Sequence, residues 1–330
     1  MLLSTVTQAE VTPQQRLHVH DLPTPVTDQA SEIIQGLLAT QKTVSPKYFY
    51  DDEGSRLFDQ ITRLKEYYPT RAEHGILSRY ADQICAHMDG DTAIIEPGSG
   101  TSDKVRHLLD PGFAATYAPI EISKECLLSA ASALTEDYPA LTVHAICADF
   151  TALAQIPHAL STHRKTAFFP GSTIGNFEPD DAIALLKSIH SMIGINSRLL
   201  IGVDLLKSVD ILHAAYNDNA GVTAQFNLNL LKHIGRVMDC EFDMEKFSHL
   251  AVFNPEHGRI EMHLKCEQSH QMMLQDNEIR FEKNETIHTE NSYKYTIEQF
   301  ESLAEQAGFQ REATWLDDDA LFSFHAFIAV

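Results

Sequence analysis

Acidic residues and glycines follow three short apolar segments in the first half of the chain. A Glu-Pro-Gly-Ser-Gly run at residues 96–100 comes after the first segment, Glu121 ends the second, and Asp149-Phe150 follows the third. A glycine turn lets a ligand approach the backbone, and an acid at the second position accepts the hydrogen bonds of ribose hydroxyls. An aspartate followed by an aromatic ring can bind an adenine amino group and cover the ring. The three positions together predict a site for an adenosine-containing cofactor.

Two common phosphate-binding patterns are incomplete in this chain. The dinucleotide pattern G-x-G-x-x-G has Asp103 in place of its third glycine, and no G-K-S/T sequence occurs. A carboxylate such as Glu96 beside the loop suits a cationic cofactor without phosphate, and S-adenosylmethionine is such a molecule. We therefore expect a methyltransferase. The alternatives are an NAD-linked oxidoreductase and a structural turn with two solvated acids.

Segments of two kinds alternate over residues 92–203. β-prone segments lie at residues 92–95, 116–120, 141–146, 166–169 and 199–203, and helices are expected from Ser102, Ser123 and Asp180. This alternation predicts an α/β fold, a Rossmann-like, mainly parallel, twisted sheet that binds ligands at the carboxyl ends of its strands. Two further strands, at 310–316 and 322–328, would add an antiparallel pair.

The remaining segments suggest an inserted domain. Residues 1–27 have little periodicity and predict a loose arm, whereas residues 70–73 have capping-box spacing at the start of a helix. Residues 209–238 have a helical pattern, and β-like segments continue to Thr289. We therefore predict a methyltransferase domain of residues 72–206 and 294–330, and a substrate-binding domain of residues 1–71 and 207–293.

Charge and composition exclude several classes of protein. The 330 residues include 25 Lys and Arg against 46 Asp and Glu, a net charge of −21, which argues against binding to nucleic acid or to an anionic membrane surface. No apolar run approaches the ~20 residues of a membrane span. The cysteines and histidines lack metal-ligand spacing. We expect a cytoplasmic monomer without a metal, whose partner is a small molecule.

Several long motifs resemble one enzyme family. They lie at residues 46–51, 66–73, 169–177, 217–224 and 287–295. From about Pro46 to its C-terminus the chain resembles the histidine Nα-methyltransferases of the ergothioneine pathway. That family also contains the methyltransferase portion of ovothiol synthases and a fungal enzyme acting on a prenylated tryptophan. The resemblance implies S-adenosylmethionine-dependent methylation of the α-amino group of histidine or a histidine derivative, to the trimethylated betaine.

The resemblance also implies roles for individual residues. Cofactor contacts fall on Tyr50, Gly98, Lys104, Glu121, Asp149, Phe150 and Gly171. Amino-acid contacts fall on Tyr67, Asn176, Tyr216, Met262, Glu290 and Ser292. Of these residues, Asn176 and Tyr50 are assigned to the catalytic step. Glu121 replaces the aspartate that the family often has at the ribose position, and it can accept the same hydrogen bonds.

The chemistry of these side chains agrees with their implied roles. The amide of Asn176 both donates and accepts, so it can hold an α-carboxylate and an α-amine together. Tyr216 can donate to the carboxylate, and the ring of Tyr50 can form a wall beside the growing cation. Glu290 and Ser292 are two residues apart, so on a strand they face the same way. They can bind both nitrogens of an imidazole, Glu290 as an acceptor and Ser292 as donor or acceptor.

Alternatives remain open for several of these residues. Plain packing explains Met262 better than a specific contact, because a thioether fills gaps in a pocket wall. Asn176 as a turn residue, Tyr216 as a core tyrosine, and Glu290 and Ser292 as solvent-facing residues are the structural alternatives. A sulfur- or selenium-substituted histidine is the nearest alternative substrate, because residues 289–295 resemble the ovothiol-type branch at least as closely. A binding or scaffold protein without catalysis would be expected to lack this polar set.

Overall fold

The computed structural model describes residues 12–22, 28–88, 90, 92–112, 114–153 and 155–330. The chain forms two compact units: Met1–Thr24 with Ala81–Phe168, and Pro25–Tyr80 with Phe169–Val330. Within the described ranges, no helix has both the length and the apolar composition needed to cross a membrane. The predicted division of roles between residues 72–206 with 294–330 and residues 1–71 with 207–293 stays a prediction.

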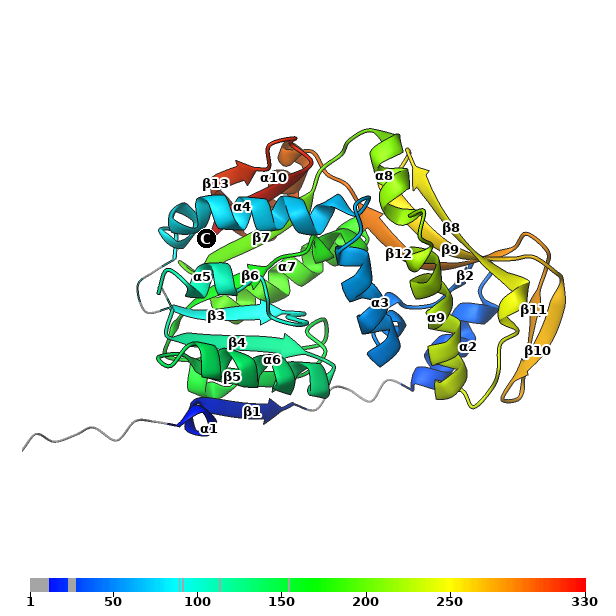
Figure 1. The fold of residues 1–330 in the computed structure, drawn as a ribbon, viewed down its shortest axis with the longest axis horizontal. Coiled ribbons are helices and arrows are strands. Elements are labelled where there is room, and N and C mark those ends of the chain that lie inside the picture. Colours follow the sequence, from blue (N-terminus) through cyan, green and yellow to red (C-terminus); the bar gives the residue numbers. More distant parts are fainter. Residues whose placement is uncertain (1–11, 23–27, 89, 91, 113, 154) are drawn as a thin grey trace, which may run out of the picture. The chain divides into compact units, whose positions relative to one another are not determined.

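The first unit is built on parallel strands in the order β1-β5-β4-β3-β6 (Figure 1). Its elements are α1 (Pro13–Arg16), β1 (Leu17–Asp21), β3 (Thr92–Pro97), α5 (Arg106–Leu109), β4 (Thr116–Glu121), α6 (Lys124–Asp137), β5 (Thr142–Cys147), the 3₁₀ helix η2 (His158–Leu160) and β6 (Arg164–Phe169). Every residue of β3 is buried, as expected for a parallel strand covered on both faces. The predicted α/β fold with a mainly parallel sheet is confirmed.

Part of the predicted loose arm is ordered. Residues 1–11 and 23–27 of that arm lie outside the described residues, but β1 pairs with β5 from Leu17↔Val143 to Asp21↔Cys147. The guanidinium of Arg16 donates to three backbone carbonyls at 2.6–2.9 Å, next to the start of this strand. The expectation was wrong here because β1 is a five-residue edge strand with only two apolar residues, Leu17 and Val19, which is too short a pattern to identify a strand.

The second unit contains three sheet portions. Its elements are α2 (Gln29–Leu38), β2 (Lys42–Thr43), η1 (Pro46–Phe49), α3 (Asp52–Thr62), α4 (Tyr68–Cys85, which continues into the first unit), η3 (Thr173–Asn176), α7 (Pro179–Ile193), β7 (Arg198–Asp204), α8 (Val209–Tyr216), α9 (Val222–Val237), η4 (Met244–Lys246), β8 (Phe247–Asn254), β9 (Arg259–Cys266), β10 (His270–Leu274), β11 (Asn277–Phe281), β12 (Thr286–Tyr293), α10 (Ile297–Gln306), β13 (Phe309–Leu316) and β14 (Phe322–Ala329). The strands pair as β7-β14-β13, β2-β12-β9-β8 and β10-β11. The predicted closing antiparallel pair is β13-β14.

Helices α2, α3, α8 and α9 share one apolar core with strands β8, β9, β11 and β12. Aspartates start several of these helices because a carboxylate accepts hydrogen bonds from the free N–H groups of the first turn. Asp51 accepts from Gly54 N at 2.7 Å at the start of α3, and Asp218 accepts from Val222 N at 2.9 Å and Thr223 N at 2.8 Å at the start of α9. This core fixes the face of β12 that carries candidate site residues.

Two helix starts differ from expectation. Only the short α5 follows Ser102, because Ser102 has a φ of 56°, a left-handed conformation that a helix does not accommodate. Helix α4 begins at Tyr68, so Glu73 does not close a capping box. Instead Glu73 is buried, and both of its carboxylate oxygens accept a hydrogen bond from Gly171 N, at 2.9 and 3.0 Å.

We predict that Gly202→Ala destabilises the protein. A Cβ at Gly202 in β7 would lie 2.0 Å from Glu73 Oε1 and 3.0 Å from a ring carbon of Phe322. Such overpacking costs about 1–3 kcal/mol in the free energy of unfolding. Gly75→Ala in α4 is the matched control, because a Cβ there meets nothing within 4 Å. It should be neutral or stabilising by up to ~1 kcal/mol. Urea denaturation measures both variants, and equal stability would contradict the packing described here.

Candidate cofactor and amino-acid sites

The turn after β3 is held by the end of β4. Gly98 N and Ser99 N both donate to the carbonyl of Ile120, at 2.8 and 3.2 Å. Gly98 and Gly100 have φ angles of 66° and 51°, which favour glycine. Gly98 is exposed, so the turn presents accessible backbone at the carboxyl end of the sheet, where ligands bind in folds of this class.

Glu121 holds the same turn with its carboxylate. Oε2 accepts from Gly100 N at 3.1 Å, and Oε1 accepts from Ser123 N at 3.0 Å. Each carboxylate oxygen can accept more than one hydrogen bond, so both can still accept from a ligand. The predicted ribose acceptor is therefore also the residue that shapes the glycine turn.

Asp149 and Phe150 lie at the carboxyl end of β5. Asp149 Oδ1 accepts from the backbone N and the hydroxyl of Thr151 at 2.9 and 2.6 Å, while Oδ2 takes no hydrogen bond from any described residue. A Cβ at Gly98 would lie 3.1 Å from the ring of Phe150, so the glycine is needed for this close approach. The structure thus brings Gly98, Glu121, Asp149 and Phe150 to one edge, with a free oxygen and an aromatic ring suited to adenosine. Lys104 is half-buried beyond the turn.

Glu96, predicted as a carboxylate beside a cationic cofactor, is instead bonded inside the protein. Its side chain is buried and accepts from the hydroxyl of Tyr117 at 2.5 Å. The same hydroxyl lies 2.9 Å from Ser102 Oγ. Glu96 therefore supports the turn from inside the unit.

In the second unit, a register shift in β12 sets which way the candidate residues face. The pairing with β9 shifts between His288 and Glu290, after which Glu290 pairs with Met262 and Ser292 with Ile260. Directly paired side chains lie on one face of a sheet. Glu290, Ser292 and Met262 therefore share a face, as the spacing of Glu290 and Ser292 predicted. Met262 is 2 % exposed and packs into the apolar core.

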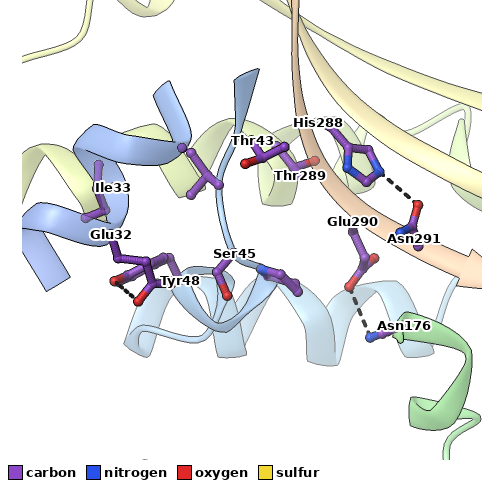
Figure 2. Close-up of a pocket in the computed structure, with 13 residues that line it drawn as sticks. Glu32, Ile33, Thr43, Ser45, Tyr48, Asn176, His288, Thr289, Glu290 and Asn291 are labelled. Atoms are coloured by element: carbon purple, nitrogen blue, oxygen red, sulfur yellow. Dashed lines mark hydrogen bonds between the residues drawn. The ribbon is translucent and has the colours of Figure 1, made fainter. Parts of the chain in front are cut away.

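Asn176 and Glu290 lie side by side (Figure 2). Asn176 Nδ2 donates to Glu290 Oε1 at 3.3 Å. Asn176 ends η3, and the preceding Gly175 allows η3 to approach β12 closely, since a Cβ there would lie 2.9 Å from the carbonyl oxygen of Tyr293. Burial raises the pKa of Glu290 to about 7, against the opposing effect of Lys294.

Tyr216 and Ser292 form a second pair beside this one. The Tyr216 hydroxyl donates to Ser292 Oγ at 2.7 Å, and Lys294 Nζ donates to Ser292 Oγ at 2.6 Å and to the Tyr216 hydroxyl at 3.1 Å. Tyr216 is 8 % exposed, and burial raises the pKa of its phenol above the usual range. The phenol therefore stays a neutral donor across the physiological range.

Aromatic rings connect Tyr50 to the amino-acid residues. The ring of Tyr50 is 5.9 Å from that of Phe58, Phe58 is 6.4 Å from Tyr67, and Tyr67 is 6.4 Å from Tyr216, each edge to face. Burial, with the nearby Tyr216 and Glu290, raises the pKa of Tyr67 far above its usual range. Tyr50, Tyr67 and Tyr216 thus belong to one chain of contacting rings, and an aromatic face left open in it can stabilise a cation.

A cavity of about 250 Å³ reaches Asn176 and Glu290. Figure 2 shows the other residues around it, which come from α2, the segment 43–48 and the middle of β12. Tyr67, Tyr216, Met262 and Ser292 are not among its lining residues. Two of the predicted amino-acid contacts thus face this cavity. Tyr216 and Ser292 are hydrogen-bonded to each other and to Lys294, whereas Met262 lies in the apolar core and Tyr67 packs against that core.

Sequence reasoning missed Glu73 and Lys294. Glu73 comes three and four residues before Ile76 and Leu77, which puts an acid on the apolar face of its helix. Lys294 comes two residues after Ser292, which puts it on the same strand face. In both cases the signal in the sequence was a charged residue at a position that the local pattern assigns to the interior of the protein. Glu73 now holds Gly171, which has a φ of 86°, and Lys294 holds Ser292 and Tyr216.

Comparison with known proteins identifies a family and relatives that match this chain over most of their length. The model of the family described as histidine-specific methyltransferase, SAM-dependent, matches residues 29–329. A histidine N-alpha-methyltransferase of Mycolicibacterium smegmatis is 38 % identical over 302 residues, covering 88 % of this chain and 93 % of that protein. Its counterpart in Mycobacterium tuberculosis is 37 % identical over 294 residues, covering 87 % and 90 %.

A more distant relative has a different amino acid in its name. An L-tryptophan methyltransferase of Psilocybe serbica is 26 % identical over 323 residues, covering 88 % of this chain and 90 % of that protein. These matches give no support to the NAD-linked alternative and confirm S-adenosylmethionine as the cofactor. With a family model that spans nearly the whole sequence, the chain belongs to the S-adenosylmethionine-dependent, histidine-specific methyltransferases.

Proposed function

We propose that this protein methylates the α-amino group of histidine, repeatedly, to the trimethylated betaine. The observation that carries the proposal is the shared face of Glu290 and Ser292 on β12, with Asn176 bonded to Glu290. A carboxylate and a hydroxyl at this spacing suit the two nitrogens of an imidazole, and the amide beside them suits the α-carboxylate and α-amine. The two mycobacterial relatives support the same substrate.

The residues of the chain act by holding and orienting the reactants. S-adenosylmethionine supplies the methyl group as part of a sulfonium cation. Glu121, Asp149 and Phe150 would hold its ribose and adenine, and Gly98, Lys104 and Gly171 would line the rest of its site. Asn176 would fix the reacting end of the amino acid, with Tyr67 and Tyr216 beside it. Such positioning contributes several kcal/mol to a displacement reaction.

The nucleophile must be an uncharged amine, because an ammonium has no lone pair. The amine would lose its proton to water before each transfer, and the nitrogen then becomes more crowded with each methyl group. Tyr50 is 37 % exposed, so part of its side chain is open to a ligand, and its ring can face the growing cation. We assign Tyr50 and Asn176 to the catalytic step.

A ring-substituted histidine is a second candidate substrate. The cavity of about 250 Å³ beside Glu290 favours it, because this space offers room for a sulfur or selenium substituent on the ring. Mass spectrometry of the purified protein with S-adenosylmethionine and, in turn, histidine, 5-thiohistidine-type compounds, ergothioneine-type thiols and tryptophan tests both candidates. Methylation of tryptophan alone would overturn the imidazole assignment. We further propose that the protein is a cytoplasmic monomer, in keeping with its charge of −21.

Glu121→Ala should weaken cofactor binding. The variant loses the hydrogen bonds to ribose and also releases Gly100 N, so the affinity for S-adenosylhomocysteine should fall about 10- to 100-fold, or about 1.5–3 kcal/mol. Titration calorimetry measures the dissociation constant. Glu125→Ala removes an exposed acid from α6 and is the control, expected to bind normally. Unchanged affinity in Glu121→Ala would move the ribose contact to another residue. S-adenosylhomocysteine, but not NAD, should also raise the melting temperature.

Glu290→Ala and Asn176→Ala should have different kinetic effects. Glu290→Ala removes a charge-assisted bond to the imidazole, so KM for histidine should rise about 10- to 100-fold with a smaller change in kcat. It should also lose discrimination against tryptophan. Asn176→Ala should lower kcat for every amino acid accepted, because the reacting end is no longer held. Glu285→Ala, which removes an acid just before the same strand, is the control. An unchanged KM for histidine in Glu290→Ala would refute the imidazole contact.

The rate should depend on pH through Glu290. Burial raises the pKa of Glu290 to about 7, so below that pH its carboxyl group is protonated and accepts only a weaker, uncharged hydrogen bond from an imidazole N–H. We expect kcat/KM for histidine to fall below pH 7 and to keep rising towards pH 9 as the amine loses its proton. Glu290→Gln has no such ionisation, so its fall below pH 7 should be shallower by about one log unit per pH unit. Parallel profiles from pH 5.5 to 9 would show that Glu290 is not the titrating group.

A further inference from the structure

A buried charged cluster lies behind Ser292 and is not used by the mechanism above. It consists of Asp204, at the end of β7, with Lys207, Lys294 and Tyr68. Asp204 Oδ2 is 2.7 Å from Lys294 Nζ, and Oδ1 is 2.5 Å from Lys207 Nζ and accepts from the Tyr68 hydroxyl at 2.8 Å. Asp204 is 1 % exposed and Lys294 is 4 % exposed.

Lys294 uses all three of its hydrogens in bonds to neighbouring side chains. An ammonium has three N–H donors and no acceptor. Its partners are Asp204 Oδ2 at 2.7 Å, Ser292 Oγ at 2.6 Å and the Tyr216 hydroxyl at 3.1 Å. Because Lys294 can only donate, the oxygens of Ser292 and Tyr216 must both accept from it.

This leaves Ser292 with no free lone pair. A hydroxyl has two acceptor lone pairs and one hydrogen. Ser292 Oγ accepts from Lys294 Nζ at 2.6 Å and from the Tyr216 hydroxyl at 2.7 Å. The hydrogen of Ser292 has no acceptor among the described residues. Towards a ligand, Ser292 therefore acts as a donor.

We propose that Lys294, anchored by Asp204, fixes Ser292 as a hydrogen-bond donor, so that the site takes a neutral imidazole with its bare nitrogen towards Ser292 and its N–H towards Glu290. The inference rests on the proposed function and deepens it. An imidazolium carries N–H on both nitrogens, so one of these donors would point at the hydroxyl hydrogen of Ser292 and find no acceptor there. Lys294 is thus a positioning residue that selects the protonation state and tautomer of the substrate ring.

The other groups around Glu290 and Ser292 are consistent with this selection. Asn176 donates to Glu290, and the phenols of Tyr67 and Tyr216 stay protonated because burial raises their pKa values. Burial opposes ionisation of Asp204, but Lys294 and Lys207 outweigh it and hold the pKa of Asp204 below its usual range. Glu73 accepts hydrogen bonds from Gly171 N, and His288 and Glu32 line the cavity that reaches Asn176 and Glu290. Asp204 therefore stays an anion that holds the side chain of Lys294 in place.

Binding of histidine and of 2-fluorohistidine tests the proposal on the unaltered protein. The fluorinated ring stays neutral throughout the range used, whereas the histidine ring, with a pKa of about 6.5, is about 90 % protonated at pH 5.5. Dissociation constants are measured by calorimetry with S-adenosylhomocysteine present, at pH 5.5 and pH 8. The ratio of the histidine constant to the fluorohistidine constant should rise about tenfold at pH 5.5. The effect of Glu290 ionisation on the binding of a neutral ring cancels in this ratio. A constant or falling ratio overturns the proposal.

Variants assign the effect to Lys294. In Lys294→Met, Ser292 regains a lone pair and can accept from an imidazolium, so the tenfold change should shrink to less than about threefold. Lys207→Met is the matched control, because it removes the other lysine from Asp204 without touching Ser292, and it should keep the full change. Ser292→Ala should flatten or reverse the trend, and it leaves the Asp204–Lys294 pair in place if Lys294→Met does not fold. A full tenfold change in Lys294→Met or Ser292→Ala overturns the role assigned here.

Methylation of histidine, followed by mass spectrometry on the same samples, separates this inference from the proposed function. Absence of any methylated histidine would refute the proposed function. Methylated histidine together with a pH-independent ratio would refute only the selection of a neutral ring by Lys294 and Ser292.

Discussion

The register shift in β12 is the constraint on which the amino-acid site depends. After the shift, Glu290 and Ser292 face Asn176 and Tyr216, while His288 and Asn291 share the opposite face, where they are hydrogen-bonded at 2.9 Å. A regular strand would put His288 on the same face as Glu290. The bulge therefore puts His288 and Glu290 on opposite faces of β12, although both line the same cavity.

The opposite face of β12 helps to position Asn176. Glu178, two residues after Asn176, accepts from Asn291 Nδ2 at 3.0 Å and from Arg259 Nη1 at 2.6 Å. The segment that begins with η3 is thus attached to the sheet by Asn176 on one face and by Glu178 on the other. Two attachments on opposite faces restrict the rotation of this segment far more than either does alone, which is what a residue that orients a reacting amine requires.

The sequence predicted the elements with strong apolar patterns and not the polar links between them. The strands around residues 92–95, 116–120 and 141–146 were recognisable because they are continuously apolar and are followed by glycines or acids. The edge strand β1 and the turn at Ser102 were not, because five residues are too few to show a clear pattern and a left-handed residue leaves no periodic signal. The positions of the candidate residues came from a family resemblance, whereas their hydrogen-bond partners depend on tertiary contacts across more than a hundred residues, as for Asn176 and Glu290.

A buried ion pair is a poor source of stability, because removing two charges from water costs about as much as their attraction returns. Apolar side chains at Asp204 and Lys294 would fill the same space without that cost. They would not, however, supply a cation whose three hydrogens all point at oxygen atoms. A methionine at Lys294 would leave Ser292 free to turn either way, and a hydroxyl that can both donate and accept does not distinguish a neutral ring from a charged one. Burying these charges therefore adds little to the stability of the fold, but it fixes the direction of hydrogen bonding at Ser292.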